Sequence, residues 1–165
     1  MNHSISILSP TAILGYGFPE SSFEAGLARH PDAIAVDAGS TDPGPYYLGS
    51  GESFTNREAV KRDLLLMIQA GLEREIPVLI GTAGGCGARP HLQWCLEIID
   101  EVLCDLNKRA LVAEVASDQD QETVTNALHA GRISALGPVP QLTEDAITNS
   151  TYIYICRFNN SPCYT

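Results

Sequence analysis

The stretch Ala33-Ile-Ala-Val36, followed at once by Asp37-Ala-Gly-Ser-Thr-Asp-Pro-Gly44, decides the fold of this chain. The first part is apolar and predicts a short buried strand, whereas the second supplies carboxylates, hydroxyls and glycines. In an open α/β sheet, ligands bind beyond the carboxyl ends of the strands. A simple turn does not require so many polar groups, so the stretch predicts a functional site at the end of a strand.

A second loop has the same character. The apolar run Val78-Leu-Ile80 leads into Gly81-Thr-Ala-Gly-Gly-Cys-Gly-Ala-Arg-Pro90, and Pro90 suits the first turn of a helix. Glycines let backbone N–H groups face a ligand, and a helix N-terminus favours an anion. We therefore predict that a carboxylate or phosphate is bound by Gly84, Gly85, Gly87 and Arg89. The alternative is a tight turn with a solvated arginine, since the loop matches no standard nucleotide-binding motif.

Strand and helix patterns alternate along the chain, which predicts βαβ units and a parallel sheet. The expected strands cover residues 4–8, 33–36, 78–80 and 110–115, and the expected helices begin near residues 20, 56, 90 and 121. The prediction is a single α/β domain over residues 1–148, a three-layer Rossmann-like arrangement with a mostly parallel sheet. Loops after all four strands, the first being residues 9–19, would then converge on one edge.

Finer patterns predict where the helices start and which faces they bury. Thr55 and Glu58 have the spacing of a capping box, and Asp118 or Asp120 would cap the helix that Gly131 ends. The helix after Pro90 carries an apolar stripe made of Leu92, Cys95, Leu96, Ile99, Leu103 and Leu106. Residues 149–165 depart from this pattern. Within them, Tyr152-Ile-Tyr-Ile155 is interpreted either as a fifth strand or as translated non-coding sequence.

Composition narrows the function classes. The 165 residues are 44% hydrophobic and 18% charged, as in a globular protein. The net charge of −10 argues against a nucleic-acid partner, which would need a basic surface. We find neither a membrane span nor a secretory signal, and the five cysteines contain no C-x-x-C pair. These features favour free thiols in the cytoplasm and argue against a membrane partner and a structural zinc site.

Several residues of the two loops are candidates for chemistry. Asp37 and Asp42 are candidates for acid–base catalysis; the alternatives are a hard cation such as Mg²⁺ or an Asx-turn. His91 is a candidate proton shuttle, or else a surface or capping histidine. Cys86 would need a base to act as a nucleophile, and the sequence names none. The neighbouring positions that we expect to line the substrate site are Gly17, Ser40, Thr41 and Tyr46.

Four segments resemble the N-terminal region of the acyclic terpene utilisation protein family. They are Ile7-Leu-Ser-Pro10, Gly15-Tyr-Gly-Phe-Pro19, Asp37-Ala-Gly-Ser-Thr-Asp-Pro-Gly-Pro-Tyr-Tyr-Leu-Gly49 and Gly81-x-Ala-Gly-Gly-x-Gly-Ala-Arg-Pro-His91. The resemblance covers about residues 4–148, and the Asp37 segment is its specific part. It implies a place in CoA-thioester metabolism beside a small companion protein. Members of the family are much longer than this sequence.

The residues and the resemblance together lead to two functional hypotheses. The first is an enzyme domain that moves a proton on a small carboxylate or acyl-CoA-type substrate, as an isomerase, hydratase or lyase. Asp37 or Asp42 would transfer the proton, and Arg89 would hold the anionic group. The second is a non-catalytic fragment or subunit that binds a ligand, a companion subunit or another copy of itself. Neither hypothesis assigns a metal or names a cofactor.

Overall fold

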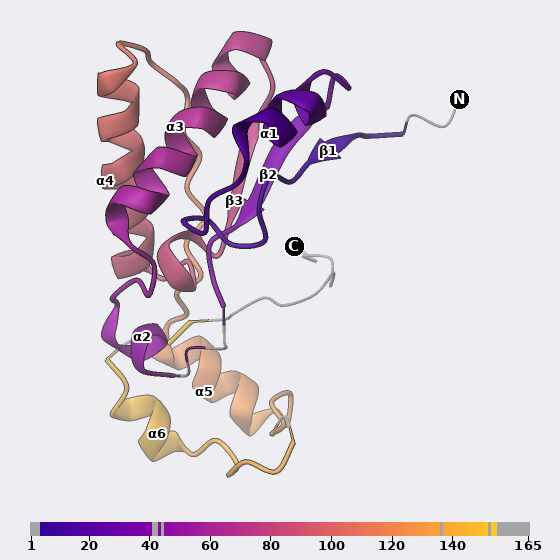
Figure 1. The fold of residues 1–165 in the computed structure, drawn as a ribbon. Coiled ribbons are helices and arrows are strands. Elements are labelled where there is room, and N and C mark those ends of the chain that lie inside the picture. The colour runs from indigo at the N-terminus through magenta and orange to yellow at the C-terminus, as the bar shows by residue number, and fades with distance from the viewer. Residues whose placement is uncertain (1–3, 41–42, 44, 136, 152, 155–165) are drawn as a thin grey trace. The chain divides into compact units, whose positions relative to one another are not determined.

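The computed structural model describes residues 4–40, 43, 45–135, 137–151 and 153–154. It contains a parallel sheet of three strands, β1 (Ile7–Leu8), β2 (Ala33–Asp37) and β3 (Val78–Gly81), in the order β1-β2-β3 (Figure 1). Ile34 of β2 lies opposite both Leu8 and Val78 in register. The predicted α/β class is confirmed, as are the first three strands.

Helices connect and follow these strands. They are α1 (Glu20–Leu27), α2 (Pro45–Ser50), α3 (Arg57–Arg74), the short 3₁₀ turn η1 (Ala83–Gly85), α4 (Arg89–Asp105), α5 (Gln121–His129) and α6 (Glu144–Thr148). The chain divides into two compact units, Met1–Ala116 and Ser117–Thr165. The single domain that we predict over residues 1–148 stays a prediction. Within the described residues, no helix is both long enough and apolar enough to cross a bilayer.

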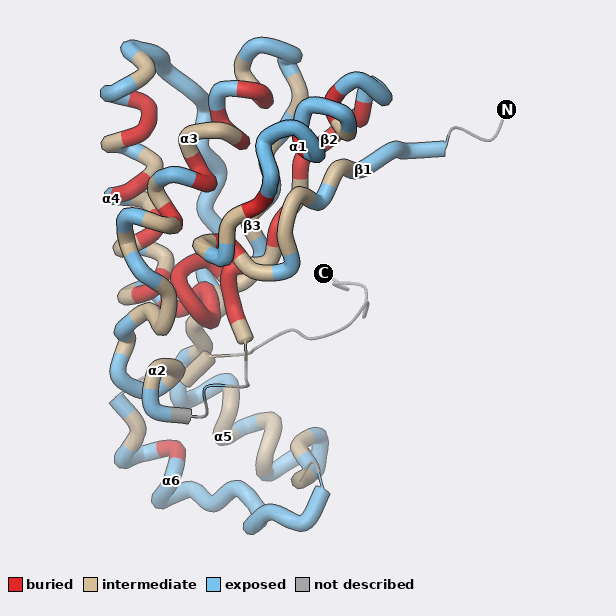
Figure 2. Tube along the Cα trace, viewed as in Figure 1, coloured by how far each residue is buried: buried red, intermediate tan, exposed pale blue. Residues whose placement is uncertain are grey.

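The core of the first unit lies between the sheet and its helices. Ile34 and Val36 of β2 are buried, and they belong to the same cluster as Leu64 of α3 and Ile98 of α4 (Figure 2). Side chains alternate between the two faces of a strand. Ile7 and Leu79 therefore lie on the opposite face of the sheet, and they are 57% and 52% exposed.

The predicted fourth strand is wrong. Residues 110–115 form no strand, and Leu111 is completely exposed. β-propensity describes how well a segment fits a pleated, half-buried surface, so it has no effect until a sheet edge accepts the segment. In a doubly wound sheet that edge is normally the outer side of β1. Here β1 has only two paired residues, so it offers few backbone groups to pair with.

The start of α3 is one residue later than the capping box predicts. The N-cap is Asn56, whose side-chain oxygen accepts hydrogen bonds from the N–H groups of Glu58 and Ala59 at 3.0 and 3.1 Å. The hydroxyl of Thr55 instead lies 2.9 Å from that of Ser53. Asn and Thr are both good N-caps, and the sequence pattern alone does not separate neighbouring candidates.

The apolar stripe of α4 is rotated from its predicted position. The buried residues of this helix are His91, Cys95, Ile98, Val102 and Leu103, whereas Leu92 and Leu96 are only half-buried. Cys104 of the same helix is exposed. Helical positions i, i+4, i+7 and i+11 share one face, so the rotation carries His91 into the interior.

In the second unit, Asp120 caps α5 and Gly131 follows the helix with a positive φ of 66°, so this helix is confirmed with both of its ends. Tyr154 forms an isolated antiparallel bridge with Asp118. Tyr152 and Ile155, the other predicted boundaries of a fifth strand, lie outside the described residues.

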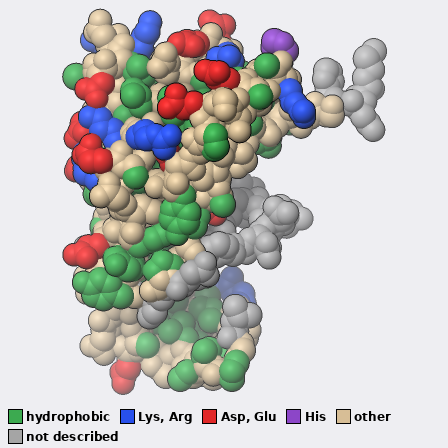
Figure 3. Space-filling view, viewed as in Figure 1, with side chains coloured by type: hydrophobic (Ala, Val, Ile, Leu, Met, Phe, Trp, Pro, Cys, Tyr) green, Lys and Arg blue, Asp and Glu red, His purple; other side chains and the backbone are tan. Residues whose placement is uncertain are grey.

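Charged side chains gather on the outer surface of α3 and α4 (Figure 3). The guanidinium of Arg57 donates to both carboxylate oxygens of Glu101, at 3.0 and 2.6 Å. The Lys61 ammonium lies 3.2 Å from Glu101 and 2.8 Å from Asp105. Hydrogen bonds from Arg57 and then Lys61 lower the pKa of Glu101 to about 2. This network joins the two helices at their solvent-facing sides.

Candidate functional site

Asp37 is the last residue of β2, and its carboxylate is held by one oxygen. Oδ1 accepts hydrogen bonds from the N–H of Gly39 at 2.9 Å and from the hydroxyl of Thr82. Among the described residues, Oδ2 has no hydrogen-bond partner. The bond from Gly39, two residues on, is the bond of the Asx-turn alternative, and the bond from Thr82 adds a contact across the two strands that orients the carboxylate through the same oxygen.

Thr82 follows β3 directly and has an unusual backbone conformation. Its φ and ψ are 46° and 40°, in the left-handed region. A β-branched residue rarely adopts this region, and such strain concentrates at functional sites. In this conformation the Thr82 hydroxyl bonds to Asp37 across two neighbouring strands. Thr82 is not among the predicted site residues, although a hydroxyl residue directly after a predicted strand is a usable signal.

The structure brings three of the four expected loops together. A Cβ added at Gly39 would lie 2.3 Å from the carbonyl oxygen of Gly85, so the Asp37 loop and the glycine loop approach more closely than a side chain permits. The first loop joins them through a hydrogen bond from Leu14 N to Asp37 O at 2.8 Å. The fourth loop was expected there only because of the strand over residues 110–115, which does not form.

The backbone donors of the glycine loop bond mostly within the loop. Gly85 N–H donates to Thr82 O at 2.8 Å, and the N–H groups of Cys86 and Gly87 donate to Ala83 O. Anion binding by Gly84, Gly85 and Gly87 stays a prediction, and it would require some of these bonds to be exchanged. Arg89 is exposed at the start of α4, a helix of 17 residues whose N-terminus no described side chain caps.

His91 is buried beneath the segment that contains α2. Its Nε2 lies 3.1 Å from the carbonyl oxygens of Tyr47 and Glu52, and its Nδ1 lies 3.1 Å from the sulfur of Cys86. The backbone of His91 reaches this position because residue 84 is glycine: a Cβ there would lie 2.1 Å from His91 O. His91 is 1% exposed. His91 is therefore not a surface histidine, and its roles as a proton shuttle or as a capping residue stay predictions.

The remaining predicted site residues have varied surroundings. Gly17 lies in the first loop, and its N–H donates to the buried carboxylate of Asp63 at 3.0 Å. Ser40 is half-buried near Asp37, and Tyr46 is 65% exposed on α2. Thr41 and Asp42 lie outside the described residues, so their predicted roles are not tested.

Asp63 is a buried charged residue that is not among the predicted site residues. Its Oδ2 also accepts the N–H of Gly15 at 2.9 Å, and Oδ1 lies 3.2 Å from the Arg62 guanidinium. Arg62 in turn donates to Phe18 O. These contacts attach the first loop to α3, so Asp63 positions a wall of the site.

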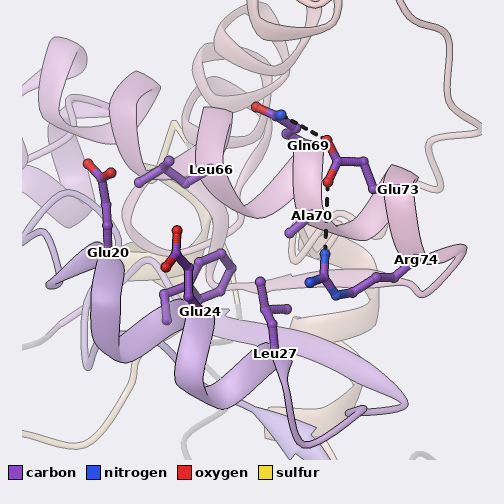
Figure 4. Close-up of a pocket in the computed structure, with 9 residues that line it drawn as sticks. Glu20, Glu24, Leu27, Leu66, Gln69, Ala70, Glu73 and Arg74 are labelled. Carbon is purple, nitrogen blue, oxygen red and sulfur yellow. Dashed lines mark hydrogen bonds and ion pairs between the residues drawn. The ribbon is translucent and has the colours of Figure 1, made fainter.

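A groove of about 210 Å³ lies between α1 and α3 (Figure 4). Apolar, polar and charged side chains line this groove. They are Glu20, Phe23, Glu24, Leu27, Leu66, Gln69, Ala70, Glu73 and Arg74. This groove lies over the second half of α3, which leads to the start of β3 and so away from the carboxyl ends of the strands. It is separate from the site at Asp37.

Comparison with known proteins gives no assignment: no family model, no curated protein and no solved structure matches this chain. In the part of the chain that is described, no three His, Cys, Asp or Glu side chains form a group suited to a metal ion. The chemistry of the site must therefore be argued from its own residues.

Proposed function

We propose that this chain is a cytoplasmic enzyme domain that transfers a proton on a small carboxylate or acyl-thioester substrate, as an isomerase, hydratase or lyase. The observation that carries this proposal is the carboxylate of Asp37, held through Oδ1 by Gly39 and Thr82 at the end of β2. A general base must be fixed and within reach of the proton that it removes. The resemblance to the acyclic terpene utilisation family supports the same substrate class.

Arg89 and the N-terminus of α4 are the proposed site for the anionic group of the substrate. Arginine binds carboxylate and phosphate with two parallel hydrogen bonds, and the positive end of a long helix favours the same charge. Arg89 is the first residue of α4, in the loop that meets Asp37.

Solvent deuterium incorporation tests this proposal even while the product is unidentified. The full chain is incubated in D₂O with a panel of short carboxylates and acyl thioesters, and deuterium uptake at carbon is followed by mass spectrometry. Asp37→Asn should lower uptake by about 10²–10⁴-fold, the usual contribution of a general base. Asp32→Asn is the matched control, because Asp32 is an exposed carboxylate just before the same strand.

The result is decisive when both variants melt as the wild type does. Equal uptake by wild type and Asp37→Asn removes Asp37 from the mechanism, and no uptake from any member of the panel removes the proton-transfer proposal. Thr82→Ala should lower uptake less than Asp37→Asn, since it disturbs the orientation of the base and not its chemistry.

A second candidate function is a binding subunit, and the exposed sheet face favours it. A parallel sheet is usually covered on both faces, yet Ile7 and Leu79 are half-exposed. We propose that a companion subunit or a second copy covers this face and completes a three-layer Rossmann-like arrangement. Light scattering over a dilution series tests this: association that Leu79→Glu abolishes supports it, and a wild-type monomer at all concentrations contradicts it.

A further inference from the structure

The hydrogen bonds of His91 fix which ring nitrogen carries a proton. Nε2 lies 3.1 Å from two carbonyl oxygens, those of Tyr47 and Glu52, and a carbonyl oxygen only accepts. Nε2 must therefore be the donor. In neutral imidazole the other nitrogen, Nδ1, is then an acceptor. Nδ1 is the atom that lies 3.1 Å from the Cys86 sulfur.

From this geometry we propose that Cys86 and His91 form a nucleophilic pair, in which Nδ1 takes the thiol proton and the Cys86 sulfur attacks the carbonyl carbon of an acyl thioester. A nucleophile, an adjacent base and a third group that orients the base are the elements of such a site. The two backbone carbonyls orient the imidazole here. Cys86 also precedes α4 by three residues, so the positive end of that helix favours the thiolate.

The surrounding backbone favours a thioester over an amide as the electrophile. Cleavage of an amide relies on N–H donors directed at the developing oxyanion. The N–H groups of Gly85, Cys86 and Gly87 instead donate to Thr82 O and Ala83 O. A thioester needs less help, because its carbonyl is more electrophilic and a thiolate leaves readily.

The proposed step is balanced within the pair and the substrate. The Cys86 sulfur forms a bond to the acyl carbon, and the bond from that carbon to the sulfur of the departing group breaks. The leaving thiolate takes back the proton from His91 Nδ1, so the products are acyl-Cys86 and a free thiol. No oxidant or reductant is involved. This step does not use Asp37, so it stands or fails separately from the proposed proton transfer.

Limited alkylation of the full chain with iodoacetamide tests the pair, with each cysteine followed by peptide mass spectrometry. Cys104, which is exposed, is the internal reference for an accessible thiol. Cys95 is the reference for a thiol as deeply buried as that of Cys86, since both residues are 1% exposed and burial raises the pKa of the Cys95 thiol to about 11. A thiol in a model peptide has a pKa of about 8.5, so only about 0.3% of it is thiolate at pH ~6. At pH ~6, Cys86 should react with iodoacetamide at least ~10-fold faster than Cys104 does.

His91→Gln separates the base from the structural role of the histidine. A glutamine amide N–H can still donate to the carbonyls of Tyr47 and Glu52, but it offers no base to Cys86. In this variant the low-pH reactivity of Cys86 should disappear. A simple acetyl thioester should also acetylate Cys86 in the wild type and protect it from iodoacetamide, and Cys104 should be left unprotected.

Three results would overturn the proposal. They are a Cys86 that reacts only after denaturation, a pH profile that follows Cys104, and reactivity that His91→Gln leaves unchanged. The wild-type pH profile decides the question by itself if His91→Gln does not fold, because only a paired thiol keeps its rate as the pH falls from ~8 to ~6.

Discussion

The two faces of the sheet carry similar residues and have different surroundings. On one face, Ile34 and Val36 are buried against helices, together with Leu64 and Met67. On the other, Ile7 and Leu79 are half-exposed although they are equally apolar. An apolar strand is therefore stable only when another element packs on its faces, but the sequence of the strand does not determine which segment that element is.

The largest expected effect comes from truncating a leucine at each face: Leu64 of α3, which packs against the covered face, and Leu79 of β3, on the exposed face. Leu64→Ala should lower the free energy of unfolding by about 2–5 kcal/mol, because Leu64 is fully buried and the change leaves a cavity. Leu79→Ala should change it by less than ~0.5 kcal/mol, as for other exposed positions. Urea denaturation at low protein concentration measures both. Equal losses would mean that the second face is covered in solution.

The next largest effect is expected at Asp63, because its carboxylate attaches the first loop to α3, a helix that packs against the covered face of the sheet. Asp63→Ala leaves the N–H groups of Gly15 and Gly17 without their acceptor and should cost about 2–3 kcal/mol. Asp32→Ala is the control: Asp32 accepts one backbone N–H, that of Ser6 at 2.7 Å, at an exposed position. We expect about 0.5–1 kcal/mol there. The assignment of Asp63 to loop anchoring fails if the two variants unfold at the same urea concentration.

The presence of β2 and β3 could be predicted from the sequence because the evidence there is local, although each strand ends one residue later than the predicted 33–36 and 78–80. Short apolar runs change abruptly to glycine and polar residues at Asp37 and Gly81, and the structure ends both strands at these residues. The start of α3 moved by one residue because Thr55 and Asn56 are both acceptable caps. Local patterns thus locate an element better than its ends.

Contacts between distant segments could not be predicted. The Thr82 hydroxyl meets Asp37 only because β2 and β3 pair in the observed register. The pairing of Cys86 with His91 depends on the rotation of α4, which the leucines of the helix suggested incorrectly. Residues 110–115 have the composition of a strand, but no sheet edge pairs with them.

A smaller effect is expected on the outer side of the helix layer, where Glu101 joins α3 to α4. The pKa of Glu101 is lowered to about 2 from 4.5, so the folded state favours the ionised form. Its contribution to stability is therefore complete above pH ~4.5 and is lost as the pH falls through about 2. The difference in melting temperature between wild type and Glu101→Gln should shrink over this range. Glu97→Gln, on the same helix, should show a smaller difference, and equal behaviour would contradict the network.

The smallest expected change is in residues 110–115, the segment that is predicted to be a fourth strand and that is exposed in the structure. Leu111 is fully exposed, so Leu111→Glu should alter the free energy of unfolding by no more than ~0.5 kcal/mol. If residues 110–115 instead formed the fourth strand that their composition predicts, the same change would bury a charge and cost several kcal/mol. Val115→Glu is the companion variant, because Val115 is also exposed. Large losses in both variants at low protein concentration would show that the segment pairs with the sheet of its own chain, whereas losses that appear only as concentration rises would show that cover comes from a second molecule.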